Sequence, residues 1–537
     1  MAIVDALTFH KKVVQLYKAG QILESIECAR SALGIYHKYQ PLIETYRKIG
    51  QSIGDISLML DAASYYERAG RDPIYAIELT LFADQIYCDW ANRSCILEYL
   101  ARRYEPDFSY RGINMSLLAA IDDPKLHHAV AQCYTNFIID KMGHNLRRMK
   151  KHARRGRAES GKIRIGYVSC DFCAHPMARV IVDIIKHHDR DEFEIFGYDY
   201  SPEDGSPERQ SVRQVFENFR IFKQQDFLAC ADLVTSDDID VLIDLKGYTR
   251  DACPEIFSLR PAPIQVSFLG YPGSLAAPWI DYVIADRNVI PQEERHHWTE
   301  AMAFMPNSYY PITPLQNSTG VDLRAKRTNY GLPEGSKFVF GCFNNPFKIT
   351  PEIFRLWMKI LEQAPDSVIW LYNRMEISRQ NLRKKASAYN IDPGRLIFCE
   401  NLRHDQHLSR YKYMDLCLDT TPYNAHTTAT DALCSGVPVL TLPGRSFASR
   451  VGLSLLRKFD LDALIAQGPD DYVHKAVDLA HNPEKAREIK ARLERAVQGQ
   501  SLSMTITYTR DLEKLFSRMV RAHDNGRSGC DLMEMDD

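Results

Sequence analysis

Residues 417–444 combine hydroxyl, imidazole and carboxylate side chains around a single turn. An apolar run is followed by a polar turn, and a helix is predicted to begin after His426. Thr427 and Thr428 can cap that helix through their hydroxyl groups. The N–H groups and positive end of a helix attract anions, so the turn could hold a diphosphate, with the Asp431 carboxylate reaching ribose hydroxyls. An ordinary capped helix between two strands explains the same pattern.

Other patterns that could carry chemistry are weaker. No GxGxxG opens a strand–turn–helix unit and no GxxxxGKS/T occurs, which argues against a nicotinamide or flavin dehydrogenase and a P-loop NTPase. Asp238 and Asp240 form a DxD pair, a possible metal site, but at the start of a strand they are better interpreted as solvated turn residues. Cys170 and Cys173 form one CxxC with no second pair, which favours reduced thiols over a zinc or redox site.

Strands and helices alternate on both sides of the diphosphate-type turn. Over 160–312, β-rich runs such as KIRIGYVS and DVLIDLKG are separated by predicted helices, including VRQVFENFRIFK at 212–223. A polar linker is expected over 313–335, and the alternation restarts over 336–500. This pattern predicts an α/β chain with two Rossmann-like domains, each a parallel sheet covered by helices. Such sheets bind ligands at the carboxyl ends of their strands, so a groove between the two domains is expected.

The flanking segments differ in character. Residues 1–155 are predicted to be all helical, and either degenerate tetratricopeptide-type (TPR) hairpins or a plain helical cap fits their irregular spacing. The basic run RRMKKHARRGRAESGK near residue 150 is interpreted as a solvated linker rather than a patch for an acidic partner. We expect a helix over 501–527 that packs back across the domains, and an acidic tail over 528–537 whose last segment, DLMEMDD, is disordered.

Bulk composition limits the classes of partner. The 537 residues are 45% hydrophobic and 25% charged, with a net charge of −2, so neither nucleic acid nor an anionic membrane is expected as a partner. The first residues lack the pattern of a secretory signal, and no apolar stretch reaches the ~18 residues of a membrane span. Thirteen scattered cysteines fit reduced core thiols. A cytoplasmic location is therefore expected.

Four ordered segments resemble a known family: GYVSCDFCAHP, LRPAPIQVSFLGYPG, FGCFNNPFKITP and DTTPYNAHTTATDALCSGVPVLTLPG. Over residues 110–500 the chain resembles the catalytic region of the O-linked N-acetylglucosamine transferase and Spindly-type family, in a short bacterial-type form. The resemblance implies the GT-B fold of two Rossmann-like domains. It also implies an inverting glycosyltransferase that uses a nucleotide sugar, with no metal and no other cofactor.

The resemblance assigns roles to individual residues. Lys348 would act on the donor diphosphate together with the backbone N–H groups of 427–428, and His175 would lie at the reaction centre, with the identity of the base left open. Beyond these two catalytic candidates, the nucleotide-sugar site would comprise Asn345, His404, His407, Arg410, His426, Thr427, Thr428, Asp431, Leu269, Gly270 and Pro272. Within this set His407 would lie against uracil, Arg410 beside the base, and His426 on the sugar.

Several positions depart from the animal pattern. Asn345 stands where the family often has Gln, and His404 replaces a Lys that contacts ribose, which leaves that contact open. Tyr423 and Ala425 replace smaller residues near the sugar, so the N-acetyl pocket is expected to differ. Asn114 stands in place of an upstream His.

The sequence therefore predicts transfer of a sugar, with UDP-N-acetylglucosamine (UDP-GlcNAc) the expected donor, to Ser or Thr of an acceptor protein. The chain could also form a homo-oligomer. Alternatives are GDP-fucose or a UDP-hexose as donor, a non-catalytic helical-repeat scaffold, and a nucleotide-sugar epimerase of the same fold.

Overall fold

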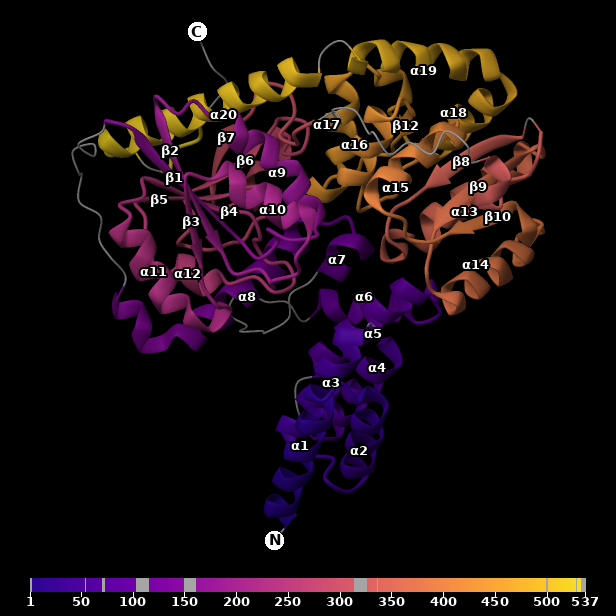
Figure 1. Cartoon of the computed structure of the whole chain (residues 1–537). Helices are drawn as coiled ribbons and strands as arrows, with labels where there is room; N and C mark the ends of the chain where they lie inside the picture. The colour runs from indigo at the N-terminus through magenta and orange to yellow at the C-terminus, as the bar shows by residue number, and fades with distance from the viewer. Residues whose placement is uncertain are drawn as a thin grey trace. The chain divides into compact units, whose positions relative to one another are not determined.

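The computed structural model describes residues 2–53, 55–69, 73–102, 115–148, 161–312, 326–335, 337–498, 501–527 and 529–532. The chain divides into two compact units, Met1–Tyr104 and Glu105–Asp537 (Figure 1). None of the helices in the described ranges combines the length and the hydropathy needed to traverse a lipid bilayer.

The first unit is a stack of helices. Its described helices are α1 (Ala2–Lys18), α2 (Ile22–Ile35), α3 (Gln40–Ile53), α4 (Ile56–Arg68), α5 (Pro73–Tyr87) and α6 (Arg93–Ala101). Successive helices contact one another and bury an apolar core that includes Leu33, Ile43 and Tyr46. The helical character predicted for this region is confirmed, whereas its assignment to the TPR family stays a prediction.

The second unit begins with helices that join the first sheet. In α7 (Met115–Ala120) and α8 (Pro124–Met142), Leu118 and Ile138 belong to the same apolar core as Tyr248. The Thr135 hydroxyl also donates to the Leu275 carbonyl at 2.8 Å. The helical stretch predicted over 1–155 thus contributes to both units, because the apolar faces of these two helices are covered by the sheet domain. Asn114 and most of the basic run, residues 149–160, lie outside the described residues.

The first sheet is seven-stranded and parallel, in the order β3-β2-β1-β4-β5-β6-β7. Its strands are β1 (Ile163–Ser169), β2 (Phe193–Asp199), β3 (Asn218–Ile221), β4 (Val241–Asp244), β5 (Ile264–Ser267), β6 (Tyr282–Ala285) and β7 (Ala301–Phe304). The helices between strands are α9 (Pro176–Lys186), α10 (Pro207–Val215), α11 (Phe227–Ser236) and α12 (Pro254–Ser258).

The helix predicted over 212–223 is wrong in its second half. α10 ends at Val215 and β3 follows as the edge strand, paired with β2. The aromatic ring of Phe219 lies against the backbone of Gly197 on β2, where an added Cβ would approach the ring to 2.8 Å. This glycine-to-aromatic contact between strands is a tertiary feature that overrides the local helical pattern.

The second sheet is five-stranded and parallel, in the order β10-β9-β8-β11-β12. Its strands are β8 (Phe338–Cys342), β9 (Ser367–Tyr372), β10 (Leu396–Cys399), β11 (Leu416–Leu418) and β12 (Val439–Leu440). Its helices are α13 (Pro351–Gln363), α14 (Glu376–Ala388), α15 (His404–Arg410), α16 (Thr427–Cys434), α17 (Val451–Lys458), α18 (Pro469–His481) and α19 (Pro483–Gln498).

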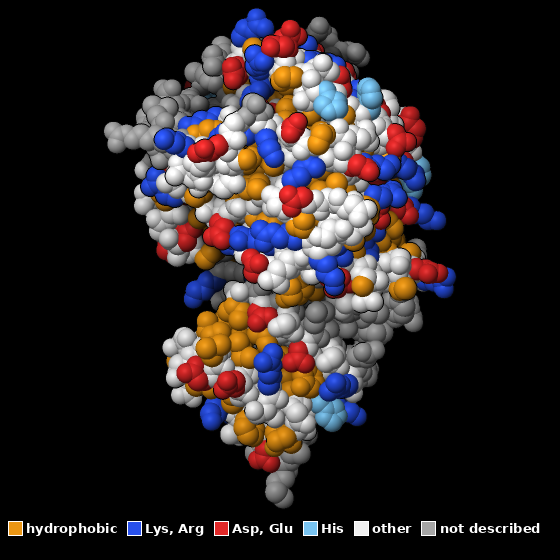
Figure 2. Space-filling model, turned by 90° about the vertical axis from the view of Figure 1, so that its right-hand side faces the viewer, with side chains coloured by type: hydrophobic (Ala, Val, Ile, Leu, Met, Phe, Trp, Pro, Cys, Tyr) orange, Lys and Arg blue, Asp and Glu red, His pale blue; other side chains and the backbone are white. Residues whose placement is uncertain are grey.

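Acidic and basic side chains are interspersed on the face shown in Figure 2, in keeping with the near-neutral net charge. The two parallel sheets and the preceding helices confirm the predicted fold class.

A polar seam joins the two sheet domains. The Asp122 carboxylate accepts hydrogen bonds from the backbone N–H groups of Arg445 and Ser446 at 2.7 and 2.8 Å. The Arg445 guanidinium pairs with Glu294 at 2.7 Å. The Ser308 and Ser454 hydroxyls share a buried hydrogen bond of 2.7 Å. Each contact links a segment that packs with the first sheet to one that packs with the second.

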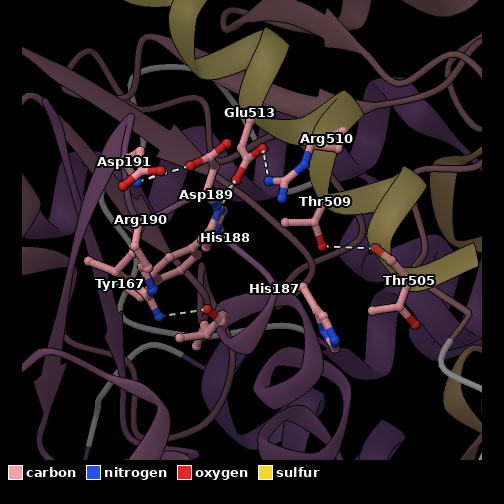
Figure 3. Close-up of polar contacts among 12 residues, drawn as sticks. Tyr167, His187, His188, Asp189, Arg190, Asp191, Thr505, Thr509, Arg510 and Glu513 are labelled. Atoms are coloured by element: carbon pink, nitrogen blue, oxygen red, sulfur yellow. Dashed lines mark hydrogen bonds and ion pairs between the residues drawn. The ribbon is translucent and has the colours of Figure 1, made fainter. Parts of the chain in front are cut away.

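The last helix, α20 (Ser501–Asp524), returns to the first sheet domain, where it contacts α9 and β5. Glu513 of α20 contacts Nδ1 of the buried His188 at 3.0 Å, and the Tyr167 hydroxyl contacts Nε2 of the same ring at 2.8 Å (Figure 3). Burial lowers the pKa of His188, which keeps the imidazole neutral, with Nδ1–H donating to the carboxylate. This buried triad fixes α20 to the end of α9.

Part of the acidic tail is ordered, so the prediction of disorder is wrong for these residues. Leu532 forms a parallel bridge with Ala303 of β7. Asp531 accepts two hydrogen bonds from Arg295 and one from the Met302 backbone N–H. These bonds extend the edge of the first sheet by a short tail segment.

Candidate active site

The turn that opens α16 is held rigidly by buried hydrogen bonds. Asp419, directly after β11, accepts the backbone N–H groups of Thr420 and Ala425 at 2.8 and 2.6 Å. His426 is the N-cap residue but makes no capping hydrogen bond, and neither Thr427 nor Thr428 caps the helix. The capping role predicted for the two threonines is therefore wrong. The Ala429 N–H already donates to the His426 carbonyl at 2.9 Å. The N–H groups of Thr427 and Thr428, which have no acceptor within the helix, can bind an anion.

Tyr310 brings the first domain into this turn. Its hydroxyl shares a hydrogen bond of 2.7 Å with Thr427 Oγ1, because the segment after β7 crosses toward the second domain. The Tyr310 ring lies edge-on to His426, with centroids 6.0 Å apart. The Nε2 atom of His426 is buried and finds no hydrogen-bond partner among the described residues. An unsatisfied buried nitrogen of this kind is a candidate ligand contact.

Lys348 lies against the same turn. It ends a short 3₁₀ helix after β8, and its Nζ donates to the Asn424 carbonyl at 2.8 Å. The ammonium also lies 3.9 Å from the centroid of the Tyr423 ring. Burial lowers the pKa of Lys348 to about 8, while the charge of Asp419 opposes that shift. The structure thus brings together the lysine and the helix-opening turn that the sequence singled out separately.

His175 ends the loop that follows β1 in the first domain and is the N-cap residue of α9. Its Nδ1 accepts the backbone N–H of Met177 at 3.2 Å, so the proton of the neutral ring is assigned to Nε2. Burial lowers the pKa of His175, and the nearby Asp171 carboxylate, 3.5 Å from Nδ1, opposes the shift. In this arrangement Nε2–H is a hydrogen-bond donor rather than a proton acceptor.

Sequence reasoning missed the ion pair behind His175. Lys246 Nζ donates to Asp171 Oδ2 at 2.8 Å, and both side chains are largely buried. Asp171 follows β1 and Lys246 follows β4, and these two strands are neighbours in the sheet. The one available signal was that each residue comes directly after a buried strand, since parallel strands end at one edge.

The residues expected near uracil form a compact group on α15. Arg410 Nη2 donates to His407 Nδ1 at 2.6 Å, and its guanidinium lies 4.3 Å from the centroid of the Phe343 ring. Burial, reinforced by the charge of Arg410, lowers the pKa of His407 to about 3. Burial lowers the pKa of His404 to about 4, with the charge of Arg179 adding to the shift. Both imidazoles are therefore neutral near pH 7.

Arg179, on α9 one turn after His175, was also missed by sequence reasoning. Its Nη1 pairs with Glu208 at 3.1 Å, while its Nε is buried without an acceptor in the part of the chain that the structure describes. Burial raises the pKa of Asp431 to about 7, and the charge of Arg179 opposes the shift. Arg179 therefore places a cation of the first domain beside Asp431 and the α15 imidazoles.

The turn after β5 holds Leu269, Gly270 and Pro272, which the family resemblance includes in the nucleotide-sugar site. Leu269 has a positive φ of 62°. A Cβ added at Gly270 would lie 2.1 Å from the Leu245 carbonyl oxygen, so the glycine permits close approach of the loop after β4. Leu269, Gly270 and Pro272 thus pack the strand-end loops together, and their contact with a sugar stays a prediction. Asn345 accepts the Phe347 N–H at 3.4 Å and is otherwise exposed, so its role also stays a prediction.

The weaker candidates serve structure. Asp240 Oδ2 accepts the Arg164 backbone N–H at 2.8 Å, and Asp238 adopts a positive φ of 52°. Within the described ranges no group of three or more His, Cys, Asp or Glu side chains is arranged to hold a metal ion. Cys170 and Cys173 are not joined in a disulfide, and burial raises the pKa values of their thiols to about 12 and 11.

Comparison with known proteins identifies the family of the chain. The model of glycosyl transferase family 41 matches residues 115–314 and 315–512. The chain is 35% identical over 370 residues to a probable UDP-N-acetylglucosamine–peptide N-acetylglucosaminyltransferase, SEC, of Arabidopsis thaliana; the match covers 68% of this chain and 38% of that protein. It is 26% identical over 565 residues to a UDP-N-acetylglucosamine–peptide N-acetylglucosaminyltransferase of Caenorhabditis elegans, covering 82% and 48%.

A solved structure of a mutant O-GlcNAc transferase from Thermobaculum terrenum has a TM-score of 0.75 at 23% identity, with 98% of this chain and 99% of that chain covered, which shows a shared fold. The chain spans less than half the length of the two curated relatives. The resemblance noted in the sequence is confirmed, and with it the GT-B arrangement. The family model alone covers well over half of the residues, and the chain belongs to glycosyltransferase family 41.

Proposed function

We propose that this chain transfers N-acetylglucosamine from UDP-GlcNAc to Ser or Thr hydroxyls of proteins, with inversion and without a metal ion. The observation that carries the proposal is the contact between Lys348 and the turn that opens α16. A lysine ammonium and free helix N–H groups at one point form a site for a diphosphate. The family and the names of its relatives supply the sugar and the peptide acceptor.

The chemistry follows from charge. The acceptor oxygen forms a bond to the anomeric carbon and loses its proton to water or to a phosphate oxygen of the departing UDP, while the bond from that carbon to the diphosphate oxygen breaks. Negative charge grows on the departing UDP, where Lys348 and the N–H groups of 427–428 stabilise it. His175 Nε2–H donates a hydrogen bond to an oxygen at the reaction centre. Because Nδ1 is occupied by the Met177 N–H, His175 orients a substrate rather than taking its proton.

A donor panel tests the assignment of the nucleotide and sugar. Purified protein is mixed with UDP, GDP, UDP-GlcNAc, UDP-glucose and GDP-fucose, and the melting temperature is measured. A ligand that binds the folded state raises that temperature, so uridine nucleotides should do so. Mass spectrometry of an acceptor protein then identifies the sugar added. Stabilisation by guanine nucleotides alone would overturn the uridine assignment, and turnover of the donor without an acceptor would indicate an epimerase.

A second donor is favoured by one observation. The Tyr423 ring lies 5.1 Å from the His426 ring, where the family resemblance places the sugar. An aromatic ring at this position takes up space that an N-acetyl group could need. A hexose without that group is therefore the second candidate, and the UDP-glucose and GDP-fucose arms of the panel test it.

Lys348→Ala should lower kcat by at least 10²- to 10³-fold, the usual effect of losing one group that stabilises a developing anion. The fold should survive, because the side chain donates to one backbone carbonyl and bridges no structural ion pair. Transfer to an acceptor protein measures the effect, and circular dichroism checks the fold. Lys384→Ala, at an exposed position on α14, is the matched control and should transfer normally. Unchanged turnover in Lys348→Ala would refute the assigned role. Absence of transfer by the wild-type protein would instead favour the non-catalytic scaffold.

A further inference from the structure

Tyr423 lies beneath the ammonium of Lys348. The distance from Nζ to the ring centroid is 3.9 Å, well inside the range of a cation–π contact. The residue is 5% exposed, and its ring packs between Phe347 and His426 at centroid distances of 6.0 and 5.1 Å. The lysine therefore meets an aromatic face on one side and the Asn424 carbonyl on the other.

The ring is held by a turn with little freedom. The Thr420 hydroxyl donates to the Tyr423 carbonyl at 2.6 Å, and Asn424 Nδ2 donates to the Thr420 carbonyl at 2.7 Å. Asn424 is itself fixed by the Gly452 N–H, which donates to its Oδ1 at 3.1 Å. Tyr423 also belongs to an apolar core with residues of the first domain. The aromatic face is thus a preset surface rather than a mobile side chain.

Three titratable groups face Lys348 from neighbouring elements. Asp419 after β11 and Cys342 at the end of β8 favour the ammonium form, while His426 before α16 loses basicity through the charge of Lys348. Burial alone disfavours the ammonium. The negative face of an aromatic ring acts in the same direction as Asp419, because it attracts a cation even in a dry environment.

We propose that Tyr423 is a positioning residue: its ring face holds the Lys348 ammonium in its charged form and aims it at the site of the leaving group. The proposal rests on the proposed function for the catalytic purpose of Lys348, but the contact itself exists without substrate. Two substitutions distinguish the effect of the aromatic ring from the effect of the rest of the Tyr423 side chain. Tyr423→Phe keeps the aromatic face, whereas Tyr423→Leu keeps an apolar side chain and removes the face.

The test measures the ionisation of Lys348 directly, without donor or acceptor. Full-length wild type and both variants are acetylated with a trace of acetic anhydride between pH 6 and 11, and labelling of the Lys348 peptide is read by mass spectrometry. The reaction rate follows the unprotonated amine, so its midpoint reports the pKa of Lys348. We expect the midpoint of Tyr423→Leu about one pH unit below wild type. Tyr423→Phe should match wild type within about 0.3 unit, less than the ring face contributes.

The alkaline limb of kcat/KM should move with the labelling midpoint in each variant. Equal midpoints in Tyr423→Leu and wild type would overturn the proposal. So would a shift of the same size in Tyr423→Phe. A purely structural role would lower the melting temperature or kcat without moving either midpoint. If Tyr423→Leu does not fold, Tyr423→Met replaces it with the same expectation. If the labelling midpoints shift as predicted but the wild-type chain transfers no sugar, the proposed function is rejected and the contact between Tyr423 and Lys348 stands.

Discussion

At the residue scale, burial decides which side chains of the site carry charge. The pKa values of His404, His407 and His426 all lie below the ordinary value for histidine, because each ring is withdrawn from water. The positive charge at the proposed donor site therefore comes from lysine and arginine side chains. Such cations match phosphate better than neutral imidazoles do.

Arg179 has a buried Nε without an acceptor among the described residues, and we predict that it binds the nucleotide sugar without taking part in catalysis. Arg179→Gln should raise the KM for the nucleotide sugar about 10-fold and leave kcat nearly unchanged, since a charged hydrogen bond used in binding alone is lost. Initial rates at varied donor concentration measure both parameters. Glu208→Gln is the control, because it removes the partner of Arg179 and should leave KM unchanged or lower it. A loss of kcat at constant KM would contradict this role.

The ionisation of Lys348 also sets a pH limit. Its pKa of about 8 means that the ammonium is lost as pH rises through that value, so kcat/KM of the free enzyme should fall above about pH 8. Arginine stays charged in this range, so Lys348→Arg should show lower activity with no alkaline limb. The pH profiles of the two proteins are compared under saturating acceptor. A wild-type limb near the ordinary lysine value would argue against a buried ammonium.

Residues close in sequence to a motif could be predicted, and residues brought in by tertiary contacts could not. Lys348 and Thr427 stand within ordered motifs and were found in the sequence. Tyr310 and Arg179 belong to the first domain, and only the folded chain places them beside α16 and α15. The capping prediction failed for a related reason, because Thr427 bonds to Tyr310 instead of to its own helix.

At the element scale, α9 is fixed at both ends. His175 caps its start, and His188, just past its end, is held by Glu513 of α20. A helix restrained in this way cannot slide along the sheet, so the position of its first turn depends on a contact at its last. The positions of His175 and Arg179 thus depend on a helix more than 300 residues further along the chain.

Glu513→Ala should destabilise the second unit by about 1–3 kcal/mol, the cost of leaving buried donors without an acceptor. The His188 ring and the Asp189 N–H lose their acceptor, and so does the partly exposed Arg510. Urea unfolding followed by fluorescence gives the change in the free energy of unfolding. Glu484→Ala, whose side chain is 77% exposed, should change that energy by no more than about 0.5 kcal/mol. Equal effects of the two substitutions would rule out the buried triad as an anchor.

Strand and helix types were predictable wherever the hydrophobic pattern was continuous. The buried strands around the site are β1, β4, β8 and β11, and each coincides with a run of apolar residues in the sequence. β3 was mistaken for helix because an edge strand is partly exposed and lacks such a run. The acidic composition of the tail predicts disorder at Asp531, because composition contains no information about a contact with the edge of β7.

At the scale of the whole molecule, each unit has an apolar core built from its own residues. Sequence reasoning predicted the helical and α/β parts, but it could not tell that α7 and α8 share a core with the first sheet. A helix that packs with the helical unit and one that packs with the first sheet have the same amphipathic pattern, because the pattern does not specify what covers the apolar face. The distinction matters for where the chain can be shortened.

A chain that lacks residues 1–104 should retain the donor site. UDP should raise its melting temperature as much as it does in the full chain, since every candidate site residue belongs to the second unit. Transfer to a short peptide should persist, while transfer to a folded protein acceptor should fall if the helical unit presents it. Differential scanning fluorimetry and peptide labelling measure the two effects. Loss of the UDP response in an otherwise folded truncation would show that the helical unit is needed to complete the site.

The seam of Asp122, Glu294 and Ser308 has a consequence for how the enzyme responds to heat. The hydrogen bonds that Asp122 accepts, the Arg445–Glu294 ion pair and the buried Ser308–Ser454 contact all link the two sheet domains, so separating the sheets breaks all three. Residues 115–532 should accordingly melt in one cooperative step rather than sheet by sheet. A destabilising substitution in either sheet domain, even far from the proposed sugar site, would then lower the melting temperature of both domains.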